Sequence, residues 1–395
     1  EMAGSNAFAE IARVLAEGSR EPPTGGSDAS SRWHVQVCMR IARLSRLARK
    51  LTPLALAVDD LGETFPGVYP VAELRARLAE WVAGAIAVAQ HEAGGTPDAI
   101  RQLSTALTTL QRDALVLRNP LLSPGKLLFV KRYTYSPGWY YAEFMRASRF
   151  GGALCTLSLP DGKVTELAPG LEGGIFDRFD LSFDGERVVF GYKAEGGCVF
   201  RLFEVGVDGA GLRQLTFAPP DEEERIKRYW HPRYRKSGVY RHHTDDFHPC
   251  YLPDGGICFA STRCERGVLC AQDDSLSVNV LYRMGGDGSD LHMLSQGALS
   301  ESTPTVMNDG RILYTRWEYV DKGVIAVQSL WCMRPDGSGS REVYGNEIEF
   351  PPVFIHGRAI PGRSDRFVCT ATMHHPFAVG PILLLDTSRD IRTHA

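Results

Sequence analysis

The sequence predicts a mainly β fold, a β-propeller of four-stranded blades preceded by an α-helical N-terminal region. Apolar residues recur with a helical period up to about residue 118, and from Lys126 onward short strands alternate with Asp-Gly turns. Asp-Gly between apolar strands is a strong hairpin signal, because glycine adopts positive φ angles without cost. Turns of one class lie roughly 48 residues apart, from Asp161 to Asp208 and from Asp287 to Asp336, which is the length of one blade.

The N-terminal region has the apolar spacing of amphipathic helices. A linker rich in proline, glycine and serine interrupts it between residues 21 and 31. We therefore expect a helical region over residues 1–117 and a propeller over residues 118–395. The predicted helices cover residues 6–17, residues 33–58 with an interruption near Pro53, residues 71–91, and residues 99–117 with Pro97 at the start.

The propeller region contains about five recognisable blades, counted from two kinds of hairpin unit that alternate along the chain. The first blade, from Lys126, has no obvious innermost strand, and the chain ends where the fifth blade should place its outer strand. We therefore expect a ring that either closes between its two ends or is truncated and continues with a sixth blade beyond Ala395. The first kind of unit spans 181–190, 250–259 and 305–314, and the second spans 203–216, 281–290 and 330–338.

Composition and charge are those of an ordinary soluble globular protein. The chain has 395 residues, of which 44% are hydrophobic and 23% charged, and a net charge of −3, so nothing favours a nucleic-acid partner. No apolar run reaches the roughly 18 residues of a membrane-spanning helix. The chain begins with Glu1 and has no signal peptide, as expected of a processed or cut product, so its start says nothing about the compartment.

The cysteine content and the absence of several motifs argue against a disulfide scaffold, covalent haem and two classes of enzyme. The nine cysteines are too few for a disulfide-stapled miniprotein, and several, such as Cys155 and Cys369, lie in apolar strand patterns typical of buried thiols. The sequence has no Cys-x-x-Cys-His motif, so we expect no covalent haem. It also lacks a nucleophile elbow, a P-loop and a dinucleotide fingerprint, which argues against a propeller-type peptidase and a nucleotide-binding enzyme.

Topology predicts that the residues with functional chemistry lie together at one mouth of the propeller. In a four-stranded blade, the loops between the second and third strands leave on the same face as the connections between blades. The long, histidine-rich connection over residues 217–247 therefore joins the second-to-third loops there. The predicted mouth contains a His/Asp/Cys group, made of His242, His243, Asp246, His248, Cys264 and Cys270, and a binding face made of Arg263, Arg316, Trp317, Glu318, Asp321, His374 and His375.

Three interpretations of this mouth stay open. Imidazole, thiolate and carboxylate groups bind metals, so the His/Asp/Cys group could hold a divalent ion such as zinc or calcium, although no Cys-x-x-Cys or His-x-x-x-His pair fixes the geometry. Cys264 and Cys270 could instead form a small loop disulfide. The polar residues could also hold the blade connections together by hydrogen bonds. Likewise, Arg316 and Asp321 flank two aromatic residues and could form a structural pair or line an anion or cofactor surface.

A set of short segments between residues 115 and 390 carries a specific combination of motifs. They are residues 119–122, 127–132, 180–185, 211–216, 249–255, 261–263, 308–312, 314–321, 344–346, 360–362 and 374–375. Together they resemble the hydrazine synthase α-subunit-like family, and the single blades resemble TolB-type repeats. Each Asp-Gly repeat alone is not specific, and the helical region lies outside the resemblance.

The resemblance implies a module of a redox protein. The true hydrazine synthase subunit is a periplasmic-type multihaem oxidoreductase, so this propeller would be a scaffold or binding domain for a haem-bearing domain or subunit, without covalent haem of its own. Two other classes stay open: a TolB-like module that binds a protein or peptide, and a metal-dependent enzyme using the His/Asp/Cys group. The resemblance favours a periplasmic location, with a cytoplasmic one still open, and leaves substrate and oligomeric state undetermined.

Overall fold

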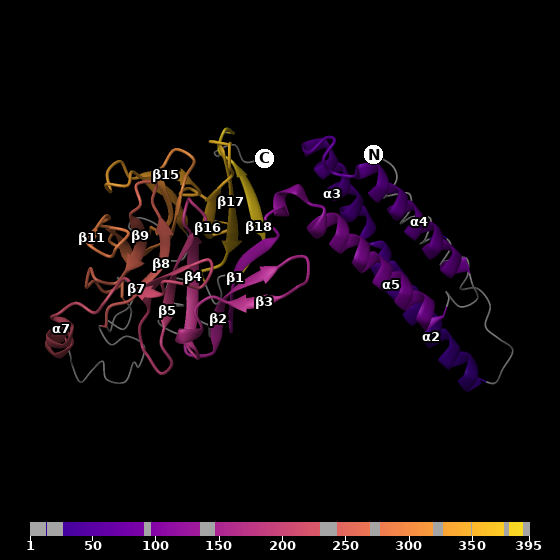
Figure 1. Ribbon diagram of the computed structural model, residues 1–395, viewed down its shortest axis with the longest axis horizontal. Coiled ribbons are helices and arrows are strands. Elements are labelled where there is room, and N and C mark those ends of the chain that lie inside the picture. Colours follow the sequence, from indigo (N-terminus) through magenta and orange to yellow (C-terminus); the bar gives the residue numbers. More distant parts are fainter. Residues whose placement is uncertain are drawn as a thin grey trace. The chain divides into compact units, whose positions relative to one another are not determined.

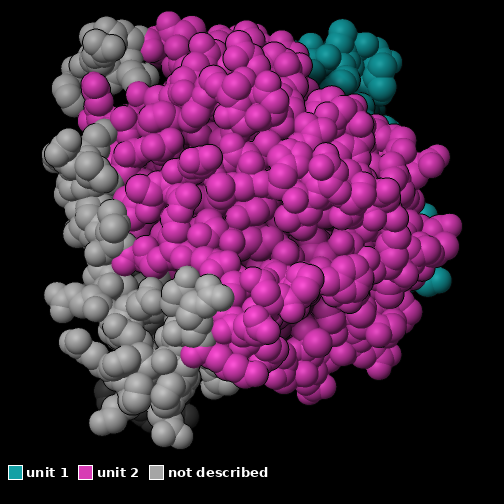
Figure 2. All heavy atoms as spheres, turned by 90° about the vertical axis from the view of Figure 1, so that its left-hand side faces the viewer, with its two compact units in different colours: residues 1–127, 157–163 teal, residues 128–156, 164–395 magenta. Residues whose placement is uncertain are grey.

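The structure, a computed structural model, describes residues 13, 27–90, 96–134, 147–229, 243–268, 277–318, 327–348, 350–374 and 379–389. The chain divides into two compact units, which Figure 2 colours separately. The first comprises residues 1–127 and 157–163, and the second comprises residues 128–156 and 164–395. Figure 1 labels helices α2 to α5 of the first unit and many of the strands that make up most of the second.

The first unit is helical, as its apolar spacing predicts. Its helices are α2 (Ser27–Ala48), α3 (Leu51–Thr64), α4 (Val71–Gln90) and α5 (Pro97–Arg112), and a π-helical turn (Asp113–Leu117) continues α5. Pro53 lies in the first turn of α3, where proline is tolerated, so the helix predicted over 33–58 becomes two helices. The Thr96 side chain caps α5 by accepting a hydrogen bond from Ala99 N–H at 3.2 Å.

The apolar stripes of these helices form one core. Its buried members include Leu44, Leu54, Leu78, Trp81 and Leu107. The helix predicted over residues 6–17 lies outside the described residues except at Arg13. Among the helices that the structure describes, none combines the length and the apolar character needed to cross a membrane.

The second unit is mainly antiparallel β-structure. Its sheets have the strand orders β1-β2-β3, β4-β5-β6-β7, β8-β9-β10-β11 and β12-β13-β14 with β15, and β16-β17-β18 joins the last through one parallel pair, Gln328 and Val353. The strands are β1 (Lys126–Arg132), β2 (Gly152–Ser158), β3 (Val164–Glu166), β4 (Ile175–Leu181), β5 (Arg187–Lys193), β6 (Arg201–Gly206), β7 (Arg213–Gln214), β8 (Asp246–Tyr251), β9 (Ile257–Ser261), β10 (Val280–Met284), β11 (His292–Met293), β12 (Glu301–Val306), β13 (Ile312–Trp317), β14 (Gln328–Met333), β15 (Arg341–Tyr344), β16 (Val353–Ala359), β17 (Arg366–Thr372) and β18 (Ile382–Asp386).

The Asp-Gly turns occupy the hairpins that the sequence predicts for them. In the turn between β8 and β9, Gly255 has φ +85° and the Asp254 carboxylate accepts a hydrogen bond from Gly256 N–H at 3.0 Å. The aspartates of the other turns accept the same bond from the residue two positions later, as expected for Asx turns. These aspartates are Asp161, Asp184, Asp208, Asp287, Asp309 and Asp336.

The first strands of successive sheets, β4, β8, β12 and β16, contact one another in that order. At one end, each is also tied to the third-strand side of the preceding sheet: Asp246 N–H donates to Phe200 at 3.1 Å and Glu301 N–H to Asn279 at 2.8 Å. This radial order of sheets is the arrangement expected of a propeller. The first sheet differs, because its Asp161 turn joins β2 to β3 and thereby gives β1 the position of a second strand.

Two glycine substitutions should change stability in opposite directions. Gly310→Ala should lower the free energy of unfolding by about 1 kcal/mol, because φ is +82° at this turn position. An added Cβ would approach only Pro253, at 3.9 Å, so no clash contributes. Gly84→Ala within α4 should raise it by about 0.5–1 kcal/mol, because alanine suits a helix interior. Denaturation followed by circular dichroism would test both signs, and a stabilised Gly310→Ala protein would contradict the turn assignment.

Candidate functional site

The four first strands share one irregularity, a β-bulge near the middle of each strand. The pairing register shifts between Phe176 and Phe179 in β4, and at the corresponding points in β8, β12 and β16. A bulge leaves extra residues unpaired and re-aims their side chains. The bulged pairs are Asp177 with Arg178, His248 with Pro249, Thr303 with Pro304, and His356 with Gly357.

Three of these bulges hold a residue other than glycine in the left-handed region. The φ angles are 52° at His248, 52° at Thr303 and 61° at His356. Such a conformation costs roughly 1–3 kcal/mol and persists where the surrounding structure enforces it, commonly at functional sites. Its repetition at one point of three neighbouring strands therefore identifies these bulges as the feature to examine for function.

The bulges line a pocket of about 430 Å³, which we call the axial pocket because four first strands surround it. This volume is within the range of small-molecule sites. Strand β1, at its second-strand position, contributes the remaining wall. The lining residues are Leu128, Phe129, Val130, Arg132, Asp177, Arg178, Phe179, His248, Pro249, Thr303, Pro304, Thr305, His356 and Arg358.

Charged groups in and beside the pocket come from strands far apart in the sequence. Arg132, Arg178 and Arg358 contribute three guanidinium groups, and Asp177 contributes a carboxylate. Arg358 on β16 also reaches Asp180 on β4, with Nη1 3.4 Å from Oδ1. This ion pair links the last of the four first strands back to the first one.

The two pocket histidines are neutral at pH 7. Burial lowers the pKa of His248 to about 3, and the charges of Arg178 and Arg132 add to this, although Asp177 acts in the opposite direction with its Oδ2 at 3.5 Å from Nε2. Burial also lowers the pKa of His356, and the nearby guanidinium groups lower it further. Both imidazoles can therefore give and accept hydrogen bonds without carrying charge.

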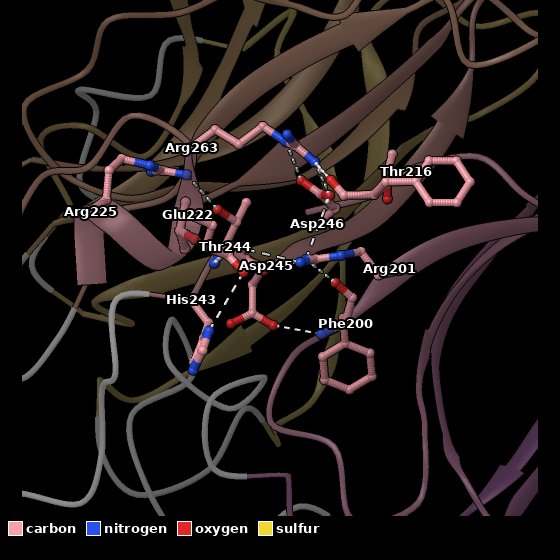
Figure 3. A network of polar contacts seen from close by, with 12 residues as sticks. Phe200, Arg201, Thr216, Glu222, Arg225, His243, Thr244, Asp245, Asp246 and Arg263 are labelled. Atoms are coloured by element: carbon pink, nitrogen blue, oxygen red, sulfur yellow. Dashed lines mark hydrogen bonds and ion pairs between the residues drawn. The ribbon is translucent and has the colours of Figure 1, made fainter. Parts of the chain in front are cut away.

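The mouth residues that the sequence singles out mostly form close pairs. Asp246 is fully buried at the start of β8. Arg263 holds its carboxylate with two hydrogen bonds, Nε to Oδ1 at 2.9 Å and Nη2 to Oδ2 at 2.6 Å (Figure 3). The Ser261 hydroxyl donates to Oδ1 at 2.7 Å. This bidentate pair fixes the end of β9 against the start of β8.

His243 belongs to a second group, around the helix α7 (Glu222–Tyr229). Its Nδ1 lies 3.5 Å from Oε2 of Glu222, while Oε1 of Glu222 accepts a hydrogen bond from Thr244 N–H at 2.7 Å. Burial alone would raise the pKa of Glu222, but His243, Thr244 and the charge of Arg201 together lower it to about 2. Figure 3 shows this group beside the Asp246–Arg263 pair, where it ties α7 to the start of β8.

The next sheets repeat the pattern of buried polar pairs at this end. Arg316, near the end of β13, forms an ion pair with Glu318 and lies 3.8 Å from Glu301, the buried first residue of β12. His374 packs on the buried Trp317 ring, with centroids 5.2 Å apart. These contacts match the interpretation in which polar mouth residues hold the sheet connections together.

The His/Asp/Cys group does not converge within the part of the chain that the structure describes. Asp246 pairs with Arg263, His243 with Glu222, and His248 faces Asp177 in the axial pocket. The Cys264 thiol, whose pKa burial raises, donates to the Val278 carbonyl at 3.3 Å. Among the described residues, no three His, Cys, Asp or Glu side chains are grouped to hold a metal ion. The predicted residues His242, Cys270, Asp321 and His375 lie outside the described residues.

Sequence reasoning found one residue of the axial pocket, His248, and missed the rest. A usable signal existed in two strands, where His248-Pro249 and Thr303-Pro304 begin six residues before the aspartate of an Asp-Gly turn. Proline cannot donate to a sheet ladder, so within a strand it marks an edge or a bulge. The other bulges, at Asp177 and His356, contain no proline and offer no such mark.

Comparison with known proteins supports the fold. No family model and no curated protein matches the sequence. The structure is similar to Kuenenia stuttgartiensis hydrazine synthase, with a TM-score of 0.50 and 15% identity over 67% of this chain and 38% of that one. A putative TolB from Agrobacterium tumefaciens is also similar, with a TM-score of 0.40 and 14% identity over 65% of this chain and 80% of that one. So is an oligogalacturonate lyase from Vibrio parahaemolyticus, with a TM-score of 0.38 and 11% identity over 67% of this chain and 63% of that one. The hydrazine synthase likeness supports a propeller-type fold, and this chain spans less than half of the chain it matches there.

Proposed function

We propose that the second unit is a propeller-type binding module that takes a small polar ligand in the axial pocket. The observation that carries this proposal is the convergence of four bulged first strands on one cavity of about 430 Å³ lined by arginine, histidine and threonine side chains. Sites of this size with a few convergent polar groups on a rigid scaffold are typical of ligand binding.

A thermal-shift screen tests this proposal. A panel of organic acids, amines and neutral polyols would be offered to the wild-type chain and to two variants. A ligand at 100 times its dissociation constant should stabilise the fold by about 2.7 kcal/mol, which is roughly 5–10 °C for a unit of this size. Phe129→Trp enlarges a wall side chain and should reduce the shift, whereas Phe183→Trp changes an exposed phenylalanine outside the pocket and should not. Equal shifts in both variants would place binding elsewhere.

The family resemblance extends the proposal to a redox assembly. In this extension the module resembles the hydrazine synthase α-subunit-like family and positions a haem-bearing domain or subunit in an extracytoplasmic compartment. A pyridine haemochrome assay on the purified chain should find no covalent haem, because the sequence lacks Cys-x-x-Cys-His.

A divalent metal bound through the His/Asp/Cys group stays a prediction, since His242 and Cys270 lie outside the described residues. Elemental analysis for zinc and calcium tests it.

A further inference from the structure

We propose that the exposed face of α2 and of the turn that follows it, from Val35 to Lys50, is a docking surface for an acidic protein partner. We call it the α2 face. The inference concerns the helical unit and is independent of the axial pocket. It depends on three observations: a segment that contains no acidic residue, a row of exposed cations that have no partner, and exposed apolar side chains in line with those cations.

The segment that forms α2 and the first half of α3 carries only positive charge. Residues 29–58 contain six basic residues and no aspartate or glutamate, whereas the whole chain has 47 acidic residues against 44 basic ones. Like charges three or four positions apart destabilise a helix, so helix stability does not explain this run. The six basic residues are Arg32, Arg40, Arg43, Arg46, Arg49 and Lys50.

Four of these side chains are exposed and unpaired, and we call them the α2 cations. They are Arg43, Arg46, Arg49 and Lys50. Within the part of the chain that the structure describes, no side-chain hydrogen bond or ion pair involves any of them. An exposed arginine elsewhere in the same unit is paired, since Nη2 of Arg75 lies 2.8 Å from Oδ1 of Asp59. The α2 cations are therefore available to carboxylates of another molecule.

Two exposed apolar side chains extend this face toward the N-terminus of α2. Val35 is 54% exposed and Met39 is 57% exposed. Val35, Met39 and Arg46 follow one another at spacings of four and seven residues, which place side chains on the same side of an α-helix. On the opposite side, Leu44 and Leu47 are buried in the core of the helical unit. The α2 face is therefore apolar toward its start and basic toward its end.

The composition of the α2 face favours a protein over other polyanions. Five of the six basic residues are arginines, whose planar guanidinium groups match carboxylates with two hydrogen bonds. Arginine and methionine are enriched at protein interfaces, where lysine is depleted. A helix that lies on a membrane inserts a broad apolar face, but that face of α2 is already packed in the core. A nucleic acid would use the cations and leave Val35 and Met39 in water.

A designed peptide tests the α2 face on the full chain. The probe is a labelled helical peptide of about 20 residues, with leucines over one half of one face and glutamates over the other half. One control peptide has glutamines in place of the glutamates, and a second has alanines in place of the leucines. In fluorescence anisotropy titrations, the probe should bind at least about tenfold more tightly than the glutamine peptide and about threefold more tightly than the alanine peptide. Equal affinities for the probe and the glutamine peptide would overturn the proposal.

A charge-removing variant assigns the binding to α2. The triple variant Arg43→Gln/Arg46→Gln/Arg49→Gln should bind the probe about tenfold more weakly than wild type. Its thermal midpoint should stay within about 2 °C of wild type, because the three side chains are exposed and unpaired. Arg341→Gln/Arg363→Gln is the matched control, since both arginines are exposed in the second unit, and it should keep the wild-type affinity. An unchanged affinity in the triple variant would refute the assignment.

A second variant and two other polyanions test the choice of a protein. Val35→Ser/Met39→Ser should lose the preference for the leucine-bearing probe over the alanine peptide, while its preference over the glutamine peptide remains. Vesicles of equal parts phosphatidylcholine and phosphatidylglycerol, and a DNA duplex, should bind wild type more weakly than the probe does. If vesicles or DNA bind more tightly, and the triple arginine variant loses that binding, then the α2 face is a membrane or nucleic-acid site and the proposal is wrong.

Discussion

Replacing Asp246 with alanine is expected to lower the free energy of unfolding of the second unit by about 3–5 kcal/mol. Asp246 is fully buried, and its carboxylate holds the Arg263 side chain, which is largely buried as well, through two hydrogen bonds. Removing one partner of a buried ion pair leaves the other charge without compensation, which costs far more than the pair contributes. The loss should appear as a lower denaturant midpoint with an unchanged slope.

Two further variants distinguish this cost from a general effect of losing a charge. Glu166→Ala removes the partner of Lys131, whose Nζ lies 3.7 Å away in a pair that is largely exposed, and should change stability by less than about 1 kcal/mol. The double variant Asp246→Ala/Arg263→Ala should recover part of the loss, because no unpaired charge stays buried. A loss below about 1 kcal/mol in Asp246→Ala would show that Arg263 finds another partner.

Stability should also depend on the ionisation of Asp245, which is buried beside Asp246. Burial raises the pKa of this carboxyl from 3.8 to about 7. Between these two values the folded chain holds a proton that the unfolded chain has released. The stabilisation from this group is therefore complete below pH 3.8 and is lost as the pH rises through 7, by up to about 4 kcal/mol.

Asp245→Asn tests this dependence, because asparagine does not titrate and its side-chain oxygen can still accept the hydrogen bond that Phe200 N–H donates at 2.7 Å. Relative to wild type, the variant should gain stability steadily from pH 4 to pH 7 in denaturant titrations. Asp336→Asn is the control, because hydrogen bonds from Ser338 lower the pKa of Asp336 whereas the pKa of Asp245 is raised. Its difference from wild type should stay constant above pH 5. A constant difference for Asp245→Asn as well would refute the raised pKa.

Most of the fold could be predicted from local sequence alone. The hairpins follow from Asp-Gly turns such as Asp254-Gly255, because the side chain of one residue and the backbone freedom of the next specify the turn without help from the rest of the chain. The helices from α2 to α5 follow from their apolar period. The alternation of turns also predicted that β1 would lack an inner neighbour in its sheet, as it does among the described residues.

The candidate site could be predicted only in part. The topology predicts that Asp246, Arg263 and Arg316 lie at one mouth, and in the structure Asp246 pairs with Ser261 at one end of the β8–β9 ladder and Arg316 with Glu301 at one end of the β12–β13 ladder. Their residue types suggested a common ligand, yet in the structure Asp246 and Arg263 pair with each other and Arg316 pairs with Glu318. Residue type and position do not determine pairing, since the choice depends on distances of a few ångströms between strands of the same sheet.

Local sequence patterns were enough to predict the strands and their turns. The bulging of the four first strands at one level, around the axial pocket, follows from no local pattern and is visible only once the sheets are assembled. That pocket joins residues as distant as Arg132, His248 and His356. A bulge is a mismatch of one strand against its neighbour, so it exists only once two strands are paired. The contact of Arg358 with Asp180 likewise needs the whole succession of sheets, because no local pattern relates two residues so far apart in the chain.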